Sequence, residues 1–292
     1  MTARLVPLDS QNALASAELE PYVRLRDRDL AGRTDGLFVA EGEVVVRVLA
    51  SARQTRFRVR SLLVEQRRVE TLRDVLDGLG DDVPAYVVAQ DVMNDVVGFA
   101  IHRGILALGE RGAPLAPESL LAGAATGTGT GTGGGAALAI GLVGLTNHDN
   151  VGSVFRNAAA FGARGVLLDA ATCDPLYRKS IRVSVGGALV VPFARCKSEE
   201  EMLDTIEHAG WEALSLSARG EEMLDHVVAA PPVRRGSSDG GRVLLMGTEG
   251  AGLPAHVLAR TRRVRIDMTP ALDSLNVAVA SGIALYEATR RR

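Results

Sequence analysis

Three polar segments of this sequence carry side chains that are able to do chemistry. They are Thr146–Arg156, GTEGAG at 247–252, and Asp267–Asn276, and each follows a stretch that predicts a strand. In parallel α/β sheets, ligands sit at the carboxyl ends of the strands. The three segments therefore predict a single site of hydroxyl, amide, carboxylate and guanidinium groups, suited to holding a phosphate, a ribose or a carboxylate.

Arg156 is the only charged residue between Asp149 and Arg164, and its neighbours are Val, Ser, Phe, Asn, Ala and Gly. Burying a guanidinium without a partner is costly. Arg156 is thus either a structural cation whose head group reaches water, or a ligand for phosphate, ribose or carboxylate. The sequence alone leaves both interpretations open.

The GTEGAG segment is open to two interpretations as well. Its glycines let a ligand approach the backbone closely, and Glu249 is able to accept hydrogen bonds or to orient Arg156. The alternative is a plain turn with a solvated glutamate, and composition alone favours that alternative.

The last segment leads into a helix with no polar face. From Val277 to Tyr286 only Ser281 and Gly282 are not apolar, so we expect this helix to be buried all round. Three residues at its start, Asp273, Ser274 and Asn276, are suitable N-caps. The Ser-Leu-Asn stretch is therefore either a helix cap or a part of the site.

Composition narrows the possible functions. The 292 residues are 47% apolar and 23% charged, which is ordinary for a soluble protein of about two domains. Only 4% are aromatic, which argues against a stacking surface for single-stranded nucleic acid. The net charge of −2 gives no general attraction to phosphate, so a nucleic-acid partner must be bound by local arginine clusters.

Cysteine content and hydropathy indicate a cytoplasmic protein. The two cysteines, Cys173 and Cys196, have neither metal-ligand nor redox spacing, so we expect no metal and no disulfide framework. The first residues do not resemble a signal peptide. Apolar runs are interrupted before about 18 residues, and we therefore expect no membrane partner.

Alternating strands and helices predict an α/β fold with a mostly parallel sheet. We expect a small α/β domain at residues 1–112, a Gly/Thr-rich linker at 113–136 and a second α/β domain at 137–292. The repeat at 123–135 lacks the preceding strand of a dinucleotide-binding loop, and we interpret it as a flexible linker. The strands expected in the second domain are Ala137–Leu145, Gly165–Leu168, Ala188–Pro192, Glu212–Leu216, Arg242–Met246 and Arg263–Ile266.

Together the three segments resemble the motifs of the SpoU, or TrmH, family of RNA ribose 2′-O-methyltransferases in the SPOUT superfamily. NHDNVGSVFRNAAAFG (147–162) resembles its first motif, LLMGTEGAGL (244–253) its second and IDMTPALDSLNVAVASGIALYEA (266–288) its third. RKSIRVSVGGALVVPF (178–193) resembles the segment between the first two motifs. Upstream, FVAEGEVVVRVL (38–49) and HRGILAL (102–108) resemble the small L30e-like substrate-binding domain of many members.

This resemblance implies a C-terminal deep trefoil knot, S-adenosyl-L-methionine as cofactor, RNA as substrate and a homodimer formed through the C-terminal domain. Matched position by position, it implies two sets of site residues. The catalytic set is Arg156, Asn150, Glu249, Ser274 and Asn276, and the cofactor set is Met246, Gly247, Gly250, Ile266, Met268 and Leu275. Arg156 and Arg103 are the expected RNA contacts, and ribosomal RNA is favoured over transfer RNA.

The sequence departs from the family pattern at one turn. Asp267 and Pro270 stand where the family often has Pro and Gly, and proline fixes φ, so we expect an altered path for the cofactor loop. The main alternative function is an RNA- or ribosome-binding protein of the same fold that performs no catalysis. Base methylation by a related knotted fold is a third hypothesis.

Overall fold

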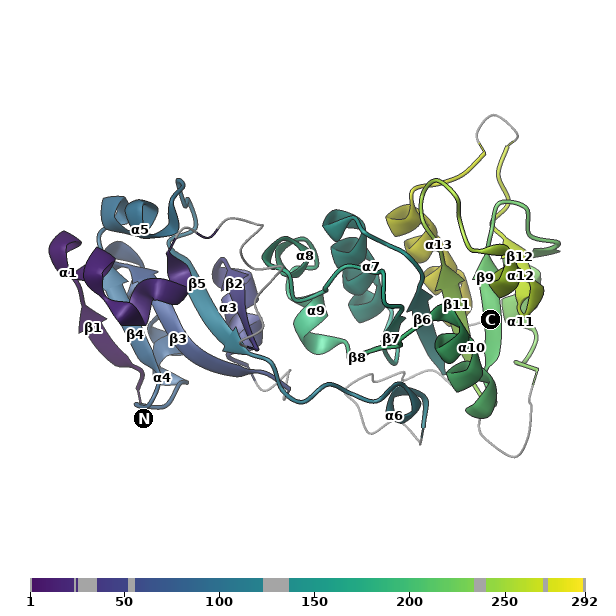
Figure 1. The fold of residues 1–292 in the computed structure, drawn as a ribbon, viewed down its shortest axis with the longest axis horizontal. Helices are drawn as coiled ribbons and strands as arrows, with labels where there is room; N and C mark the ends of the chain where they lie inside the picture. The colour runs from purple at the N-terminus through teal and green to yellow at the C-terminus, as the bar shows by residue number, and fades with distance from the viewer. Residues whose placement is uncertain are drawn as a thin grey trace. The chain divides into compact units, whose positions relative to one another are not determined.

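The computed structural model describes residues 2–23, 25, 36–51, 56–122, 137–233, 240–269 and 273–290 of the chain. The chain divides into two compact units (Figure 1): unit 1 is Met1–Ala113 with Leu176–Val190, and unit 2 is Pro114–Pro175 with Val191–Arg292. This division differs from the expected domains because residues 176–190 belong to unit 1. Part of the expected linker also belongs to unit 2, where residues 117–121 are helical. The whole Gly/Thr repeat at 123–135 and Pro270 lie outside the described residues.

Unit 1 contains a five-stranded mixed sheet in the order β1-β4-β3-β5-β2. Its strands are β1 (Arg4–Pro7), β2 (Leu37–Glu41), β3 (Arg58–Glu65), β4 (Pro84–Val88) and β5 (Ile105–Glu110). β4 pairs in parallel with β1 and β3, whereas β5 is antiparallel to β3 and β2. β1 was not predicted, because its four residues carry only a weak apolar pattern.

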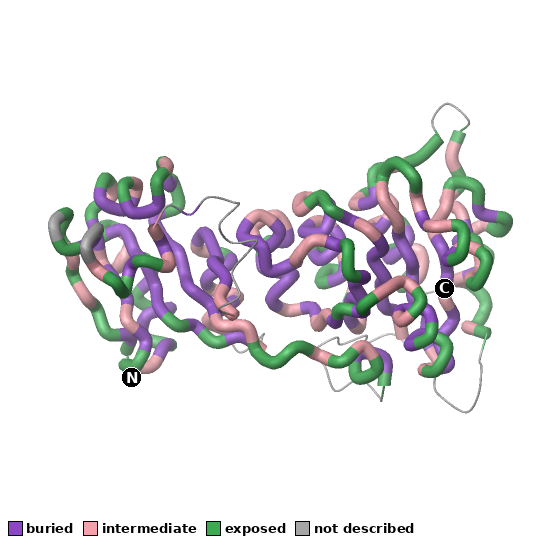
Figure 2. Tube along the Cα trace, in the orientation of Figure 1, coloured by how far each residue is buried: buried purple, intermediate pink, exposed green. Residues whose placement is uncertain are grey.

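Short helices flank the sheet of unit 1. They are α1 (Ser10–Ala15), η1 (Ala17–Tyr22), α3 (Glu43–Leu49), η2 (Gln66–Arg68), α4 (Arg73–Asp77), α5 (Gln90–Val97), α8 (Arg178–Val183) and α9 (Gly187–Val190). The apolar core joins η1 and α5 to the sheet, and in Figure 2 the strands are largely buried. Within this core the hydroxyl oxygens of Tyr22 and Ser61 are 2.8 Å apart.

Unit 2 contains a seven-stranded sheet in the order β10-β12-β9-β11-β6-β7-β8. The strands are β6 (Leu138–Leu142), β7 (Val166–Leu168), β8 (Phe193–Arg195), β9 (Glu212–Leu216), β10 (Glu222–Met223), β11 (Arg242–Met246) and β12 (Arg262–Arg265). Every strand pair of the sheet is parallel, as the alternation of strands and helices predicted.

Helices cover both faces of this sheet. They are α6 (Pro117–Leu121), α7 (His148–Ala160), α10 (Glu199–His208), α11 (Leu224–Ala229), α12 (Ala255–Ala259) and α13 (Val277–Thr289). α6, α10 and α12 share an apolar core with alternate residues of β6, β7 and β11. The helices α7 and α13 contact each other, and α13 also contacts β11. Since successive side chains of a strand point to opposite faces, the remaining residues of these strands turn away from the α10 core.

Two expectations are wrong in detail. The expected strand Ala188–Pro192 is the short helix α9, and the strand β8 begins only at Phe193. The Ser184 hydroxyl accepts from the Ala188 N–H at 3.2 Å, which favours a helical start over an extended one. The other error concerns the closing helix. In the single chain α13 is not buried all round, because Val279, Ile283 and Tyr286 are 36–52% exposed.

Candidate active site

The three polar segments leave the sheet of unit 2 at one edge. Residues 143–147 follow β6, residues 247–253 follow β11, and residues 266–276 follow β12. These strands are parallel, and β11 lies directly beside β6. The carboxyl ends of parallel strands share an edge, so the three segments meet there.

Asn150, on the first turn of α7, joins the three motifs in one hydrogen-bonded cluster. Its Nδ2 donates to Oε1 of Glu249, and its Oδ1 accepts from Nδ2 of Asn276 at 3.2 Å. Asn150 is 8% exposed, so both ends of its amide have partners although the residue is buried. Glu249 therefore has Asn150 as its partner, rather than Arg156, which sequence analysis had considered.

Asn276 is also the N-cap of α13. Its Oδ1 accepts from the Ala278 N–H at 2.8 Å, whereas Asp273 and Ser274 are exposed and do not cap the helix. The cap uses the oxygen of the amide, and the contact with Asn150 uses the nitrogen. The alternatives of a cap and a site residue therefore do not exclude each other, since one side chain makes both contacts.

The loop that leads into α7 is held by side chains that sequence analysis did not select. The Asn147 side chain caps α7 and accepts from the backbone N–H of Asn150 at 3.4 Å. The buried carboxylate of Asp169, just after β7, accepts from the N–H of Gly144 at 2.9 Å and of Thr172 at 2.7 Å. A lone aspartate that directly follows an apolar strand is the sequence signal that could have identified it.

A second asparagine fixes α7 against α13. Nδ2 of Asn157 donates to the carbonyl oxygen of Ala278 at 2.8 Å and to Oγ of Ser281 at 2.9 Å. A Cβ on Gly282 would lie 3.3 Å from the same nitrogen, so the glycine allows the two helices to approach closely. This contact holds the start of α13, and with it Asn276, beside α7.

The loop after β11 folds tightly on itself. The N–H of Gly252 donates to the carbonyl of Thr248 at 3.1 Å, and Gly252 has a φ of +70°. A Cβ on Gly247 would overlap the backbone of Gly252 and Leu253, whereas one on Gly250 would meet nothing within 4 Å. Gly247 is thus required by the loop itself, and Gly250 lies on its open side.

The remaining residues of the expected cofactor set lie on the segments of this edge. Met246, the last residue of β11, is buried. Ile266, Met268 and Leu275 are half-buried, and Asp267 between the first two is exposed. The edge therefore offers apolar side chains beside backbone groups, which is the kind of lining that small-molecule sites use.

The structure does not bring the two expected arginines into the cluster. Arg156 is exposed on α7, and it pairs with no other residue in the described parts of the chain. Arg156 lies six positions after Asn150, which turns it about 120° away around the helix. Ser274 is exposed as well. Arg103 is an exposed residue of unit 1, where its side chain lies against Gly42.

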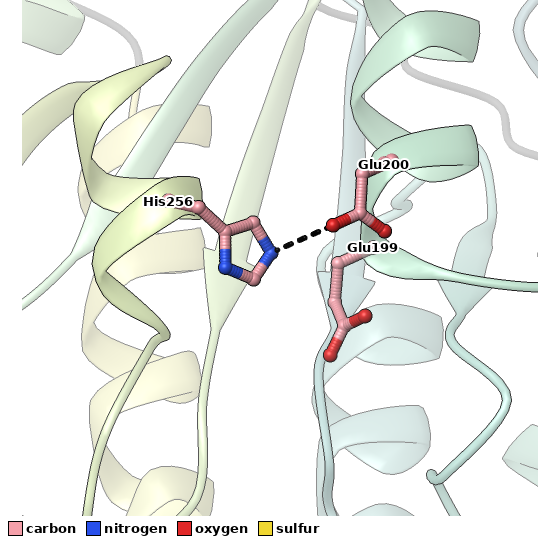
Figure 3. Close-up of side chains that lie close together, drawn as sticks. All are labelled: Glu199, Glu200 and His256. Atoms are coloured by element: carbon pink, nitrogen blue, oxygen red, sulfur yellow. Dashed lines mark ion pairs between the residues drawn. The ribbon is translucent and has the colours of Figure 1, made fainter.

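Another group of side chains has the chemistry of metal ligands. Figure 3 shows His256 of α12 pointing toward Glu200 at the start of α10, with Nε2 and Oε1 3.3 Å apart and Glu199 nearby. The backbone N–H of Glu200 lowers the pKa of its carboxyl most, followed by the Ser198 hydroxyl. The ion pair and the helix start thus engage this carboxylate already, and we assign no metal to the group.

No helix in the described part of the chain is long and apolar enough to cross a membrane.

Comparisons with known proteins agree with this geometry. Residues 137–286 match the model of the SpoU rRNA Methylase family. An uncharacterized tRNA/rRNA methyltransferase of Mycobacterium bovis is 39% identical over 257 residues, which cover 87% of this chain and 81% of the relative. A similar protein of Synechocystis is 32% identical over 156 residues, or 53% of this chain and 54% of the relative.

Solved structures share the fold over almost the whole chain. An AdoMet-bound rRNA methyltransferase from Sinorhizobium meliloti has a TM-score of 0.73 at 21% identity and covers 97% of both chains. The SpoU methyltransferase AviRb from Streptomyces viridochromogenes, in complex with AdoMet, has a TM-score of 0.70 at 23% identity and covers 94% of this chain and 97% of its own. At these identities the likeness concerns the fold alone.

Proposed function

Because this chain belongs to the SpoU rRNA methylase family, we propose that it transfers a methyl group from S-adenosyl-L-methionine to the 2′-hydroxyl of a ribose in structured RNA. The observation that carries the proposal is the cluster of Asn150, Glu249 and Asn276, in which one residue from each motif is hydrogen-bonded at the edge of the parallel sheet. Ribosomal RNA is the favoured substrate, and the cytoplasm is the expected location.

The carboxyl edge of the sheet suits the cofactor. Apolar surface from Ile266, Met268 and Leu275 is available to an adenine ring, and the loop after β11 is open at Gly250. Met246 and Gly247 complete the binding set by shaping the base of that loop. When bound, S-adenosyl-L-methionine supplies a methyl group on a sulfonium, which an oxygen nucleophile accepts without help from a metal.

The chain's polar residues then act on the RNA. With the cofactor bound, its methyl carbon would be the group that the ribose 2′-oxygen takes from the sulfonium, and the hydroxyl proton would pass to water or a phosphate. A guanidinium stays protonated at neutral pH and is a poor base. Arg156 therefore holds the RNA and stabilises the charge that develops on the oxygen. Ser274 and Asn276 hold the ribose, while Asn150 and Glu249 keep Asn276 in position.

We assign unit 1 the role of an L30e-like RNA-binding domain. Arg103 is exposed beside the turn that follows β2. A polar hollow of about 450 Å³ opens in the same unit, lined by Glu65, Gln66, Arg67, Ala89, Gln90, Asp91 and Asn94. The amide groups and the one guanidinium of this lining are able to hydrogen-bond to the unpaired bases of an RNA.

We further propose that unit 2 forms a deep trefoil knot and dimerises through α13. The resemblance of residues 266–288 to the third motif of the family supports the knot. Val279, Ile283 and Tyr286 form an exposed apolar stripe at helical spacing on α13. A second copy of the chain would cover this stripe, which explains why α13 has no polar face.

Methyl transfer to RNA tests the function directly. The pure protein is incubated with labelled S-adenosyl-L-methionine and total bacterial RNA, which is then hydrolysed with alkali. Label in alkali-resistant dinucleotides is the expected result, because a 2′-O-methyl group blocks cleavage at that position. Label in an alkali-labile backbone would indicate base methylation. No label in any RNA fraction, despite RNA binding, would indicate a non-catalytic RNA- or ribosome-binding protein.

Arg156→Ala tests the role of the arginine. We expect it to abolish transfer to RNA while the cofactor affinity, measured by calorimetry, stays nearly unchanged. Arg263→Ala is the matched control, since Arg263 is another exposed arginine of unit 2, whose guanidinium pairs with Glu221. Loss of both transfer and cofactor binding in Arg156→Ala would instead indicate a structural arginine.

A further inference from the structure

Two sequence segments that resemble the family but have no role in the site meet inside unit 1. Glu41 belongs to the segment 38–49, and Arg178 and Arg182 belong to the segment 178–193. Nη1 of Arg178 donates to Oε2 of Glu41, and Nη1 of Arg182 lies 3.3 Å from the same oxygen. The partners are 137 and 141 residues apart in the chain.

The pair of Glu41 and Arg178 is buried. Their side chains are 9% and 8% exposed, whereas that of Arg182 is 35% exposed. The guanidinium of Arg178 also lies over the ring of Phe99, 5.0 Å from its centre. A buried guanidinium depends on its carboxylate partner, because removal of one partner leaves an uncompensated charge in a low-dielectric environment.

Packing around the ion pair holds the same segment. α8 contacts β2 and α9 contacts α3, as can be followed in Figure 1. Gly186 has a φ of +83°, which favours glycine, and a Cβ at this position would lie only 3.1 Å from the side chain of Val48. Residues 176–190 therefore pack as a part of unit 1, although the chain before and after them belongs to unit 2.

We infer that Glu41 is a positioning residue, whose buried ion pair with Arg178, together with its contact to the half-buried Arg182, holds the connection between β7 and β8 on unit 1. This connection leaves the sheet a few residues after Asp169, which supports the loop before α7. The chain enters this segment from Pro175 and leaves it at Val191, both of which belong to unit 2, so the segment is covalently continuous with the strands β7 and β8. The kinetic part of this inference rests on the proposed function.

Glu43 provides a matched control for Glu41. It also pairs with two arginines, Arg47 at 2.9 Å and Arg68, but its side chain is 32% exposed and its partners belong to the N-terminal part of the chain. Glu41→Gln and Glu43→Gln each remove one negative charge, and the two positions are only two residues apart. Only the first leaves a buried guanidinium without its carboxylate.

Hydrogen exchange followed by mass spectrometry measures how firmly the segment is held. In the full-length protein we expect Glu41→Gln to speed the exchange of peptides from 176–190 by about 100-fold, and Glu43→Gln by less than about threefold. The double variant Glu41→Gln/Arg178→Met should return the exchange to within about tenfold of the wild type, since it leaves no buried guanidinium without its carboxylate. Equal exchange in the two single variants would overturn the inference.

Kinetics separate positioning from a merely structural role. A loosened connection lowers the effective concentration of the target ribose at the site but leaves the RNA contacts of unit 1 intact. We expect Glu41→Gln to lower kcat about tenfold with KM for RNA nearly unchanged, and the double variant to recover it. Faster exchange with an unchanged kcat would refute the positioning role. A wild-type protein without any transfer would refute the proposed function instead, and the exchange comparison would still decide whether Glu41 holds the segment.

Discussion

Substitutions of Asn276 separate its two contacts. Asn276→Ala removes both the cap of α13 and the hydrogen bond to Asn150. The cap is worth about 1 kcal/mol, and a neutral hydrogen bond about 1 kcal/mol more, so we expect the free energy of unfolding to fall by about 2 kcal/mol. Serine caps helices as well as asparagine does, but its side chain is too short to reach Asn150. Asn276→Ser should therefore lose only about 1 kcal/mol.

Activity should follow the contact with Asn150 rather than the cap. Both variants lose this contact, and a loss of about 1 kcal/mol in the transition state slows transfer about fivefold. Urea unfolding at 25 °C gives the stabilities, and methyl transfer from labelled cofactor to RNA gives the rates. Thr289→Ala is the control, because Thr289 bonds a backbone carbonyl at the far end of the same helix. Full activity of Asn276→Ser would refute the role of the bond, and equal destabilisation of the two variants would refute the contribution of the cap.

Three further predictions concern the loop after β11, the surface of α13 and a buried thiol. Gly247→Ala should destabilise the protein by about 1–3 kcal/mol and weaken cofactor binding measured by calorimetry, because its Cβ would overlap the loop backbone. Gly250→Ala is the control, because a Cβ there meets open space and should leave the melting temperature unchanged. Equal melting temperatures of the two variants would contradict this reasoning. Ile283→Asp should convert a dimer into a monomer in light scattering after size exclusion, and a monomeric wild type would refute this proposal. Burial raises the pKa of the Cys196 thiol from 9.0 to about 12. The contribution of the buried thiol to stability is therefore complete below pH 9 and is lost as the pH rises toward 12. Alkylation of Cys196 at pH 8 should require unfolding, and rapid labelling of the native protein would contradict this prediction.

Local sequence patterns predicted much of the fold. β9 and β11 have the predicted bounds, Glu212–Leu216 and Arg242–Met246, because short apolar runs bounded by turn residues are typical of buried strands. The strand expected at 188–192 was wrong for a related reason. An apolar run of that length suits a strand or a buried helix equally, and the Ser184 contact selected the helix.

The carboxyl-edge rule correctly predicted that the three motif loops share one edge of the sheet, since it depends only on parallel strands. The hydrogen-bond partners within the site, by contrast, could not be predicted from the sequence. Asn150 bonds residues 99 and 126 positions away, and Glu249 bonds Asn150 rather than Arg156. No local pattern encodes such pairs, because they depend on the path of the chain between the strands.

The sequence by itself determined most of the elements, the motif loops and the apolar character of α13, because these depend on residue type and spacing. Only the tertiary structure decided which of three candidates caps α13 and that residues 176–190 pack with unit 1. It also decided that Glu41 and Arg178 form a buried pair. The physical reason is that hydrogen bonds and ion pairs act over a few ångströms in space, whatever the separation along the chain.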